Sequence, residues 1–137
     1  MTETSLPHAE FGFPGPLRDR LVASILSGTK TTTTSLLVEY SVEDDPLPEV
    51  GTRQAVIDST GQPVAVIETV QVDQMPLDQV PLTHVIDEGE GHATVAHWRA
   101  DHEQYWHGKE MRSYLEDPTF TVLDETVVIL ERFQLVS

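Results

Sequence analysis

The stretch from residue 51 to residue 72 constrains the fold most, because it has the pattern of two strands joined by a tight turn. Gly51 precedes the first strand, expected over residues 53–58, and Ser59-Thr60-Gly61-Gln62 is a turn sequence. The second strand is expected over residues 63–72, where valines recur at alternate positions. Two such strands with a short connection predict an antiparallel hairpin, and hence a sheet of mainly antiparallel strands.

Two helices and further strands are expected around this hairpin. Apolar residues recur at helical spacing over 14–28 and over 93–107, and a short helix is expected over 82–87. Extended structure is expected over 31–40, with the strand itself at 36–40, and closing strands over 119–123 and 126–136. This order predicts an α+β fold, a small, mainly antiparallel β-barrel with two flanking α-helices.

The length and composition fit one globular domain. The 137 residues, 39% of them hydrophobic, are expected to form a single domain over 1–137 in which residues 1–10 are a flexible segment. No run of about 18 apolar residues and no signal-peptide pattern is present, so neither a membrane span nor secretion is expected. The absence of cysteine excludes disulfides and fits a cytoplasmic location.

The net charge of −15 limits the partners. A coat-type DNA-binding or RNA-binding protein is normally basic, so this class is excluded. The partner is expected to be a small nucleoside or nucleotide, or RNA held at a local positive site. Arg99, Lys109 and Arg112 keep some positive charge near the second long helix.

Lys30 lies in a run of hydroxyl residues, 27–35, between a helix and a strand. Gly28 suits the left-handed position just past a helix end. The order of helix then strand excludes a phosphate-binding P-loop, which needs a strand before the lysine and a helix after it. A lysine of lowered pKa can take a proton from a hydroxyl, so Lys30, Thr33 and either Glu88 or Glu90 are the candidate catalytic set. Lys30 and Thr33 meet only if the backbone turns between them, because residues three apart in a strand point to opposite faces.

The histidines give a weaker signal. His92, His97, His102 and His107 are five apart, so successive side chains lie about 140° apart around a helix. They cannot share a face, and no metal ion or cofactor is expected, although a divalent ion at Glu88, Glu90 and His92 stays open.

Aromatic residues share one face of the second long helix. Trp98, His102, Tyr105 and Trp106 recur at helical spacing. This stripe either packs into the core or stacks on a base.

Gly28-x-Lys30-x-x-Thr33 resembles the signature of the ASCH domain family, a PUA-like β-barrel. Further pieces are similar in order: Phe11-Gly12, Pro48-x-Val50-Gly51, Glu88-Gly89-Glu90-Gly91, Trp98-Arg99, His102 and the strand 127–136. The resemblance to the larger bacterial members covers nearly the whole chain, and it implies a cytoplasmic, RNA-related domain.

The resemblance also implies activities. Some members resemble amidohydrolases that remove the acetyl group from N4-acetylcytidine with threonine, lysine and glutamate, here Thr33 as nucleophile, Lys30 as base and Glu88 or Glu90. Other members are described as ribonucleases, and the wider group binds modified RNA, so a non-catalytic nucleotide-binding or RNA-binding module stays an alternative. The expected substrate-binding residues are Gly28, Ser35, Trp98, Arg99 and His102.

Ser35 departs from the family pattern. Many members carry arginine at this position. The loss of that cation favours a small nucleoside or a non-catalytic binding role over general RNA binding.

Overall fold

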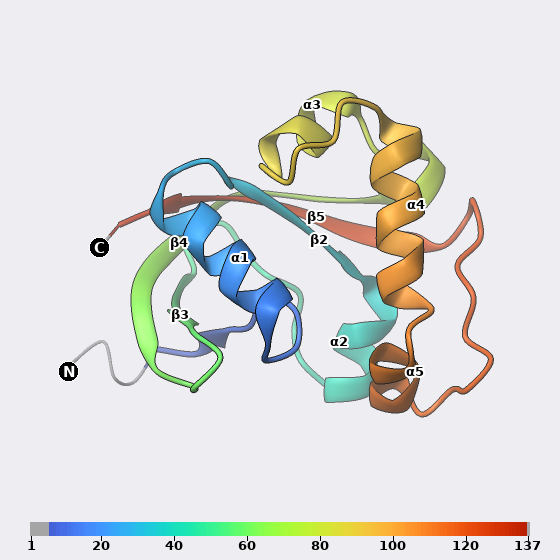
Figure 1. Ribbon diagram of the computed structural model, residues 1–137, viewed down its shortest axis with the longest axis horizontal. Helices are drawn as coiled ribbons and strands as arrows, with labels where there is room; N and C mark the ends of the chain where they lie inside the picture. The colour runs from blue at the N-terminus through green and yellow to red at the C-terminus, as the bar shows by residue number, and fades with distance from the viewer. Residues whose placement is uncertain (1–5, 137) are drawn as a thin grey trace.

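The computed structural model describes residues 6–136, which form one sheet with helices packed around it (Figure 1). In chain order the elements are β1 (His8–Ala9), α1 (Pro16–Leu26), β2 (Thr32–Leu36), α2 (Leu37–Glu43), β3 (Arg53–Ile57), β4 (Pro63–Pro76), the 3₁₀ helix η2 (Leu77–Gln79), α3 (Leu82–Asp87), α4 (Val95–Trp106), α5 (Lys109–Leu115) and β5 (Val127–Leu135). Of the expected flexible segment 1–10, residues 1–5 lie outside the described residues, whereas His8–Ala9 pair with β3. Among the described residues, every helix is too short or too polar to cross a membrane.

The sheet has the strand order β1-β3-β4-β5-β2, and every neighbouring pair except β1 and β3 is antiparallel. The predicted hairpin is confirmed as β3 and β4, paired from Arg53 opposite Glu68 to Ile57 opposite Pro63. The α+β class and the antiparallel sheet are therefore confirmed.

The predicted closure into a barrel is wrong. The strands β1 and β2 stand at the two ends of the strand order and do not pair with each other within residues 6–136. Strand β1 has only two residues, and the start of β2 is covered by α3, because the Thr31 N–H donates to the Asp87 carbonyl oxygen at 2.9 Å. The sheet is thus open, with one edge protected by a helix end.

Three local expectations also fail. The strand placed at 36–40 is wrong, since β2 ends at Leu36 and α2 begins at Leu37. Glu39 stabilises this helix start, because its carboxylate accepts the free Leu36 N–H at 2.8 Å. No strand forms over 119–123, where Asp117 accepts bonds from the Thr119 N–H and hydroxyl instead. The described residues contain five α-helices rather than two flanking ones. The short helix expected over 82–87 is confirmed as α3, whereas α2 and α5 were not expected.

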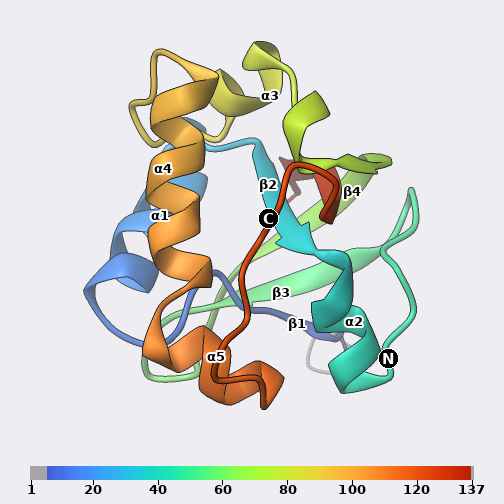
Figure 2. The ribbon, with the colours of Figure 1, turned by 90° about the vertical axis from the view of Figure 1, so that its right-hand side faces the viewer.

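Two hydrophobic clusters hold the elements together. One joins α4 and α5 to β2 and β5, and the other joins α1 to the hairpin. The expected shared face of α4 is confirmed, since Trp98 and Trp106 are fully buried and the His102 ring lies 4.4 Å and 5.3 Å from their ring centroids. The helices α1 and α4 lie on the same side of the molecule, and β2 crosses behind them (Figures 1 and 2).

Candidate functional site

The candidate site forms where the end of α1, the start of β2 and the end of α3 meet. Gly28, at φ +84°, ends α1 and turns the chain, and the Lys30 N–H donates to the Ser24 carbonyl oxygen at 3.0 Å. The next residue, Thr31, is bonded to Asp87 at the end of α3. These backbone bonds hold the loop that follows α3 against the beginning of β2.

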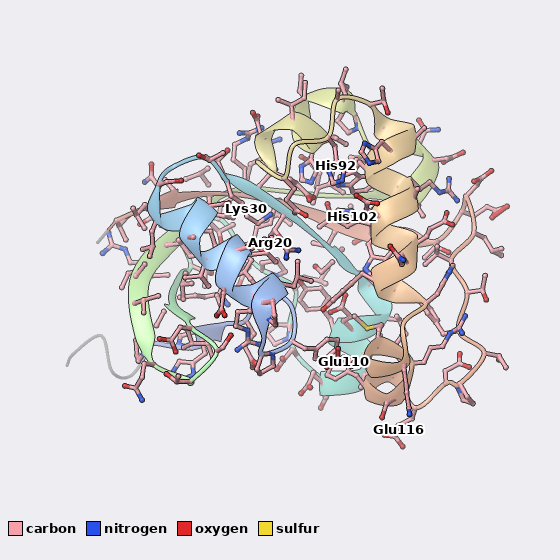
Figure 3. The ribbon with its side chains drawn as sticks, in the orientation of Figure 1. Arg20, Lys30, His92, His102, Glu110 and Glu116 are labelled. Carbon is pink, nitrogen blue, oxygen red and sulfur yellow. The ribbon has the colours of Figure 1, made fainter. Side chains whose placement is uncertain are left out.

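Lys30 is buried at this junction, with 2% of its surface exposed (Figure 3). Its Nζ donates to the Thr32 carbonyl oxygen at 2.9 Å, the Glu88 carbonyl oxygen at 3.4 Å and Glu90 Oε2 at 3.3 Å. An ammonium group has three donors, and here each has an acceptor. Lys30 precedes β2, so the alternation of side chains along that strand does not set the direction of its side chain.

Glu88 is the most heavily bonded carboxylate of the site. Its Oε2 accepts the Thr34 hydroxyl at 2.5 Å and lies 3.2 Å from His84 Nε2, and its Oε1 lies 3.2 Å from His102 Nε2. Burial alone raises the pKa of Glu88, but hydrogen bonds from His102 and His84 and the Lys30 charge outweigh it, and the pKa lies well below its usual range. Glu88 is therefore a fixed carboxylate and a poor proton donor.

His102 complements that carboxylate. Its Nδ1 lies 2.9 Å from the Trp98 carbonyl oxygen, which can only accept, so Nδ1 carries a proton. Its Nε2 faces Glu88. Burial lowers the pKa of His102, but the Glu88 hydrogen bond and charge outweigh it and raise the pKa overall. The raised pKa favours the protonated ring, which places positive charge beside Glu88.

A cleft of about 770 Å³ opens beside this junction. Six of the nine residues predicted from the sequence line it: Lys30, Thr33, Ser35, Glu88, Glu90 and His102. Thr33 is half-buried, and its hydroxyl makes no hydrogen bond to another described residue, which leaves it free for a ligand. The Ser35 hydroxyl lies 2.8 Å from the Tyr40 hydroxyl.

The other three predicted residues do not line the cleft. Gly28 serves the turn after α1. Trp98 is fully buried in the core, so its ring is not presented for stacking. Arg99 is engaged in ion pairs, at 2.7 Å with both Glu103 and Asp124.

The cleft also contains a carboxylate that sequence reasoning missed. Glu131 on β5 lies opposite Thr33 on β2 in the strand register, lines the cleft and has 8% of its surface exposed. Burial raises the pKa of Glu131, although the Thr69 hydroxyl donates to its Oε2 at 2.6 Å and opposes that shift. The available signal was a glutamate directly after the apolar run 127–130, within a predicted strand.

Two arginines on α1 line the cleft as well. Arg18 is buried and donates to Glu10 Oε1 at 3.1 Å and to the Gly12 carbonyl oxygen at 2.6 Å. Arg20 is exposed and extends from α1 toward α4 (Figure 3), and it forms no ion pair with any residue of the described range. Arg20 is thus a cation available to a ligand.

Acidic groups dominate the lining of the cleft. Eight carboxylates stand against three lysine and arginine side chains. This balance disfavours a chain of phosphates and favours a neutral or weakly charged ligand.

Two groups of side chains in the described range have the spacing of metal ligands. One is Glu88, Glu90 and His102, and the other is His92, His97 and Asp101. In the first group Lys30 Nζ already lies 3.3 Å from Glu90, so the protein's own cation occupies that place.

Comparison with known proteins gives a family match and several similar structures. A family model described as the ASCH domain matches residues 9–137. A crystal structure of a protein from Enterococcus faecalis V583 is 27% identical, with a TM-score of 0.81, and the match covers 95% of this chain and 76% of that one. An ASCH domain from Lactobacillus crispatus JV V101 is 26% identical, with a TM-score of 0.79 and coverage of 96% and 80%.

A more distant likeness concerns the fold alone. A mutant of the ASCH protein from Zymomonas mobilis is 12% identical, with a TM-score of 0.51 and coverage of 87% and 68%. No curated protein sequence is matched by this chain. With the family match spanning nearly every residue, the chain belongs to the ASCH domain family, which is generally RNA-related.

Proposed function

We propose that this protein is a hydrolase that cleaves the amide bond of an acylated nucleoside of the N4-acetylcytidine type. The observation that carries the proposal is the contact of the buried Lys30 ammonium with Glu90 at 3.3 Å, in a cleft that the free hydroxyl of Thr33 also lines. A nucleophile, a basic group and a carboxylate at one cleft are the parts that amide hydrolysis requires.

The proposed reaction begins with a proton transfer within the Lys30–Glu90 pair. Between an exposed lysine and glutamate such a transfer is unfavourable by about 8 kcal/mol, from their ordinary pKa values. A substrate that fills the cleft removes water from this pair, and loss of water favours a neutral pair over a charged one. The neutral Lys30 amine then accepts the Thr33 proton as the hydroxyl oxygen attacks the acyl carbon.

The remaining steps return both protons. Glu90 gives its proton to the nitrogen that leaves, and the acyl group stays on Thr33 as an ester. Lys30 then passes the proton it took from Thr33 to Glu90, which makes it neutral again. The neutral Lys30 amine takes a proton from water as the water oxygen attacks the ester carbon. The bond to Thr33 Oγ breaks, Glu90 gives its proton to that oxygen, and the acid leaves with Lys30 and Glu90 back in their starting forms. Glu90 suits this proton transfer better than Glu88, because its side chain is 24% exposed whereas the Glu88 carboxylate is buried and held by three donors.

Glu88 is assigned a positioning role. Its backbone carbonyl accepts from Lys30, and its carboxylate, 3.2 Å from His102 Nε2, raises the pKa of His102. It therefore sets the geometry and charge around Lys30 without exchanging a proton.

The size and charge of the cleft support a nucleoside over an RNA chain. A volume of about 770 Å³ falls in the range of roughly 300–1,000 Å³ that is typical of small-molecule sites. The excess of carboxylates in the lining and the net charge of −15 disfavour a phosphodiester backbone.

The test is to incubate the purified protein with N4-acetylcytidine and follow the release of cytidine. Lys30→Ala and Thr33→Val are each expected to reduce kcat/KM by at least roughly 100-fold. Lys109→Ala and Thr29→Val are the matched controls, because Lys109 is the only other lysine and neither residue lines the cleft. Activity that survives in the Lys30 and Thr33 variants would overturn the proposal.

A non-catalytic nucleotide-binding module is the second candidate, and the exposed Arg20 favours it. It predicts saturable binding of a nucleoside monophosphate without turnover, weakened by Arg20→Ala and by salt. Ribonuclease action predicts Lys30-dependent cleavage of a transcript, and an intact transcript would remove it.

A further inference from the structure

We propose that His92, His97 and Asp101 form a binding site for a divalent transition metal of the zinc class, at the rim of the cleft. His97 and Asp101 are four residues apart on α4 and so share a helix face. His92 approaches from the loop before α4 (Figure 3). The ligand atoms of the three side chains all lie within 4.8 Å of one another.

The distances suit a shared ion. Asp101 Oδ2 lies 2.7 Å from His92 Nε2 and 3.7 Å from His97 Nε2. With metal–ligand bonds of about 2.0–2.1 Å, tetrahedral ligand atoms stand about 3.3 Å apart. The observed separations lie on either side of that value, so small side-chain rotations are enough to complete the site.

The helix start keeps the ligands in place. The Thr94 hydroxyl caps α4 by accepting the His97 N–H at 3.1 Å, and this fixes the turn between His92 and the helix. The rings of His92 and His97 meet edge to face, with centroids 4.9 Å apart.

His92 is the buried member of this cluster. Its side chain is 5% exposed, and its Nε2 is turned toward the exposed Asp101. The surrounding residues therefore hold the ring with this nitrogen facing the ligands on α4.

The donor set indicates the kind of metal. Two imidazole nitrogens and one carboxylate oxygen are typical of Zn²⁺ and its neighbours, and unlike the all-oxygen sites of Mg²⁺ and Ca²⁺. Three protein ligands leave a fourth position for water or a ligand. Asp101 also lines the cleft, so the metal would stand beside the bound nucleoside rather than on the far side of α4.

The neighbouring group of Glu88, Glu90 and His102 is the less suitable place for the ion. A divalent ion there would stand against the Lys30 ammonium, which contacts Glu90. The ion that the sequence left open would have joined His92 to those two glutamates, whereas the structure brings His92 to two ligands on α4.

The test is a titration of the metal-free full-length protein with Zn²⁺ by calorimetry and with Co²⁺ by visible absorption. We expect one ion per chain and the absorption bands of tetrahedral Co²⁺. His97→Ala and Asp101→Asn are each expected to weaken binding by more than the roughly tenfold to hundredfold that loss of a group supporting a ligand produces. Both residues are exposed, at 63% and 54%, so the variants are expected to fold.

His8→Ala is the matched control, because His8 is an exposed histidine outside the cluster. Failure to bind Zn²⁺, or binding that both cluster variants retain, would overturn the proposal. The readouts are binding and spectroscopy, so the result is independent of whether the protein hydrolyses an acylated nucleoside.

Discussion

Gly89 packs directly against the backbone of Thr29. A Cβ atom on Gly89 would lie 2.5 Å from the Thr29 carbonyl oxygen and 3.0 Å from the Lys30 Cα, and the residue has a φ of +72°. Glycine at this position allows the loop after α3 to approach the start of β2 closely enough for the residues on either side, Glu88 and Glu90, to contact Lys30. The site thus depends on one residue that carries no functional group.

Gly89→Ala is therefore expected to damage both stability and the site. The left-handed φ alone costs an alanine roughly 1–2 kcal/mol, and the overlap with Thr29 adds to this because backbone atoms cannot move aside cheaply. Gly61→Ala is the control, since Gly61 has a φ of +85° with open space around it. Urea unfolding of both variants separates the two effects, and equal losses of stability would show that the close approach of Gly89 is unimportant.

The elements set by local periodicity were predictable from the sequence. The helix α1 and the hairpin of β3 and β4 follow from apolar spacing and a turn sequence. The open sheet was not predictable in this way, because it depends on α3 covering the edge of β2. The helix α2 was missed because Glu39 stabilises its start by a side-chain bond, which overrides the strand preference of the valine and tyrosine there.

The candidate site was predictable only in part, and for a similar reason. Lys30 and Thr33 belong to one short sequence motif, and Glu88 and Glu90 belong to another, so both pairs can be found from the sequence. Glu131 was missed because its position opposite Thr33 depends on the strand register. No local pattern encodes that register.

Thr33 and Thr34 are adjacent and of one residue type, but we expect their substitution by valine to have different effects. Thr34→Val removes the hydroxyl that donates to the buried Glu88 carboxylate at 2.5 Å. It should lower the free energy of unfolding by about 1.5–3 kcal/mol, as for hydrogen bonds to charged groups. Thr33→Val removes no hydrogen bond within the described residues and should change stability by no more than about 0.5 kcal/mol. Turnover of N4-acetylcytidine should be lost in Thr33→Val, and a fully active Thr33→Val would contradict its role as nucleophile.

The lowered pKa of Glu88 predicts a loss of stability in acid. Below the ordinary glutamate value of 4.5, the unfolded chain binds a proton that the folded chain does not. The contribution of Glu88 is therefore fully present above that pH and is lost as the pH falls through the lower folded pKa.

Glu88→Gln should remove this component and flatten the stability profile below about pH 4.5. At pH 7 it should also destabilise the fold by roughly 1.5–3 kcal/mol, because the buried donors around Glu88 lose a charged acceptor and burial then favours the neutral form of His102. Denaturant unfolding at a series of pH values measures both effects. An unchanged profile would show that Glu88 is not the carboxylate that titrates.

The pKa of Glu131 is shifted upward, opposite to that of Glu88, so its effect on stability has the opposite dependence on pH. Burial raises its folded pKa above 4.5, so its favourable contribution is present below that pH and is lost as the pH rises through the folded value. Glu131→Gln keeps the shape of the neutral acid and an oxygen to accept the Thr69 hydroxyl. We expect the variant to equal the wild type in stability near pH 4 and to exceed it at pH 7, as measured by thermal unfolding at both pH values.

If Glu131 also exchanges a proton with Thr33 or the substrate, the same variant should lose turnover while it gains stability. A variant that gains stability with full activity would limit Glu131 to the lining of the cleft, and one that loses stability at pH 7 would contradict the raised pKa.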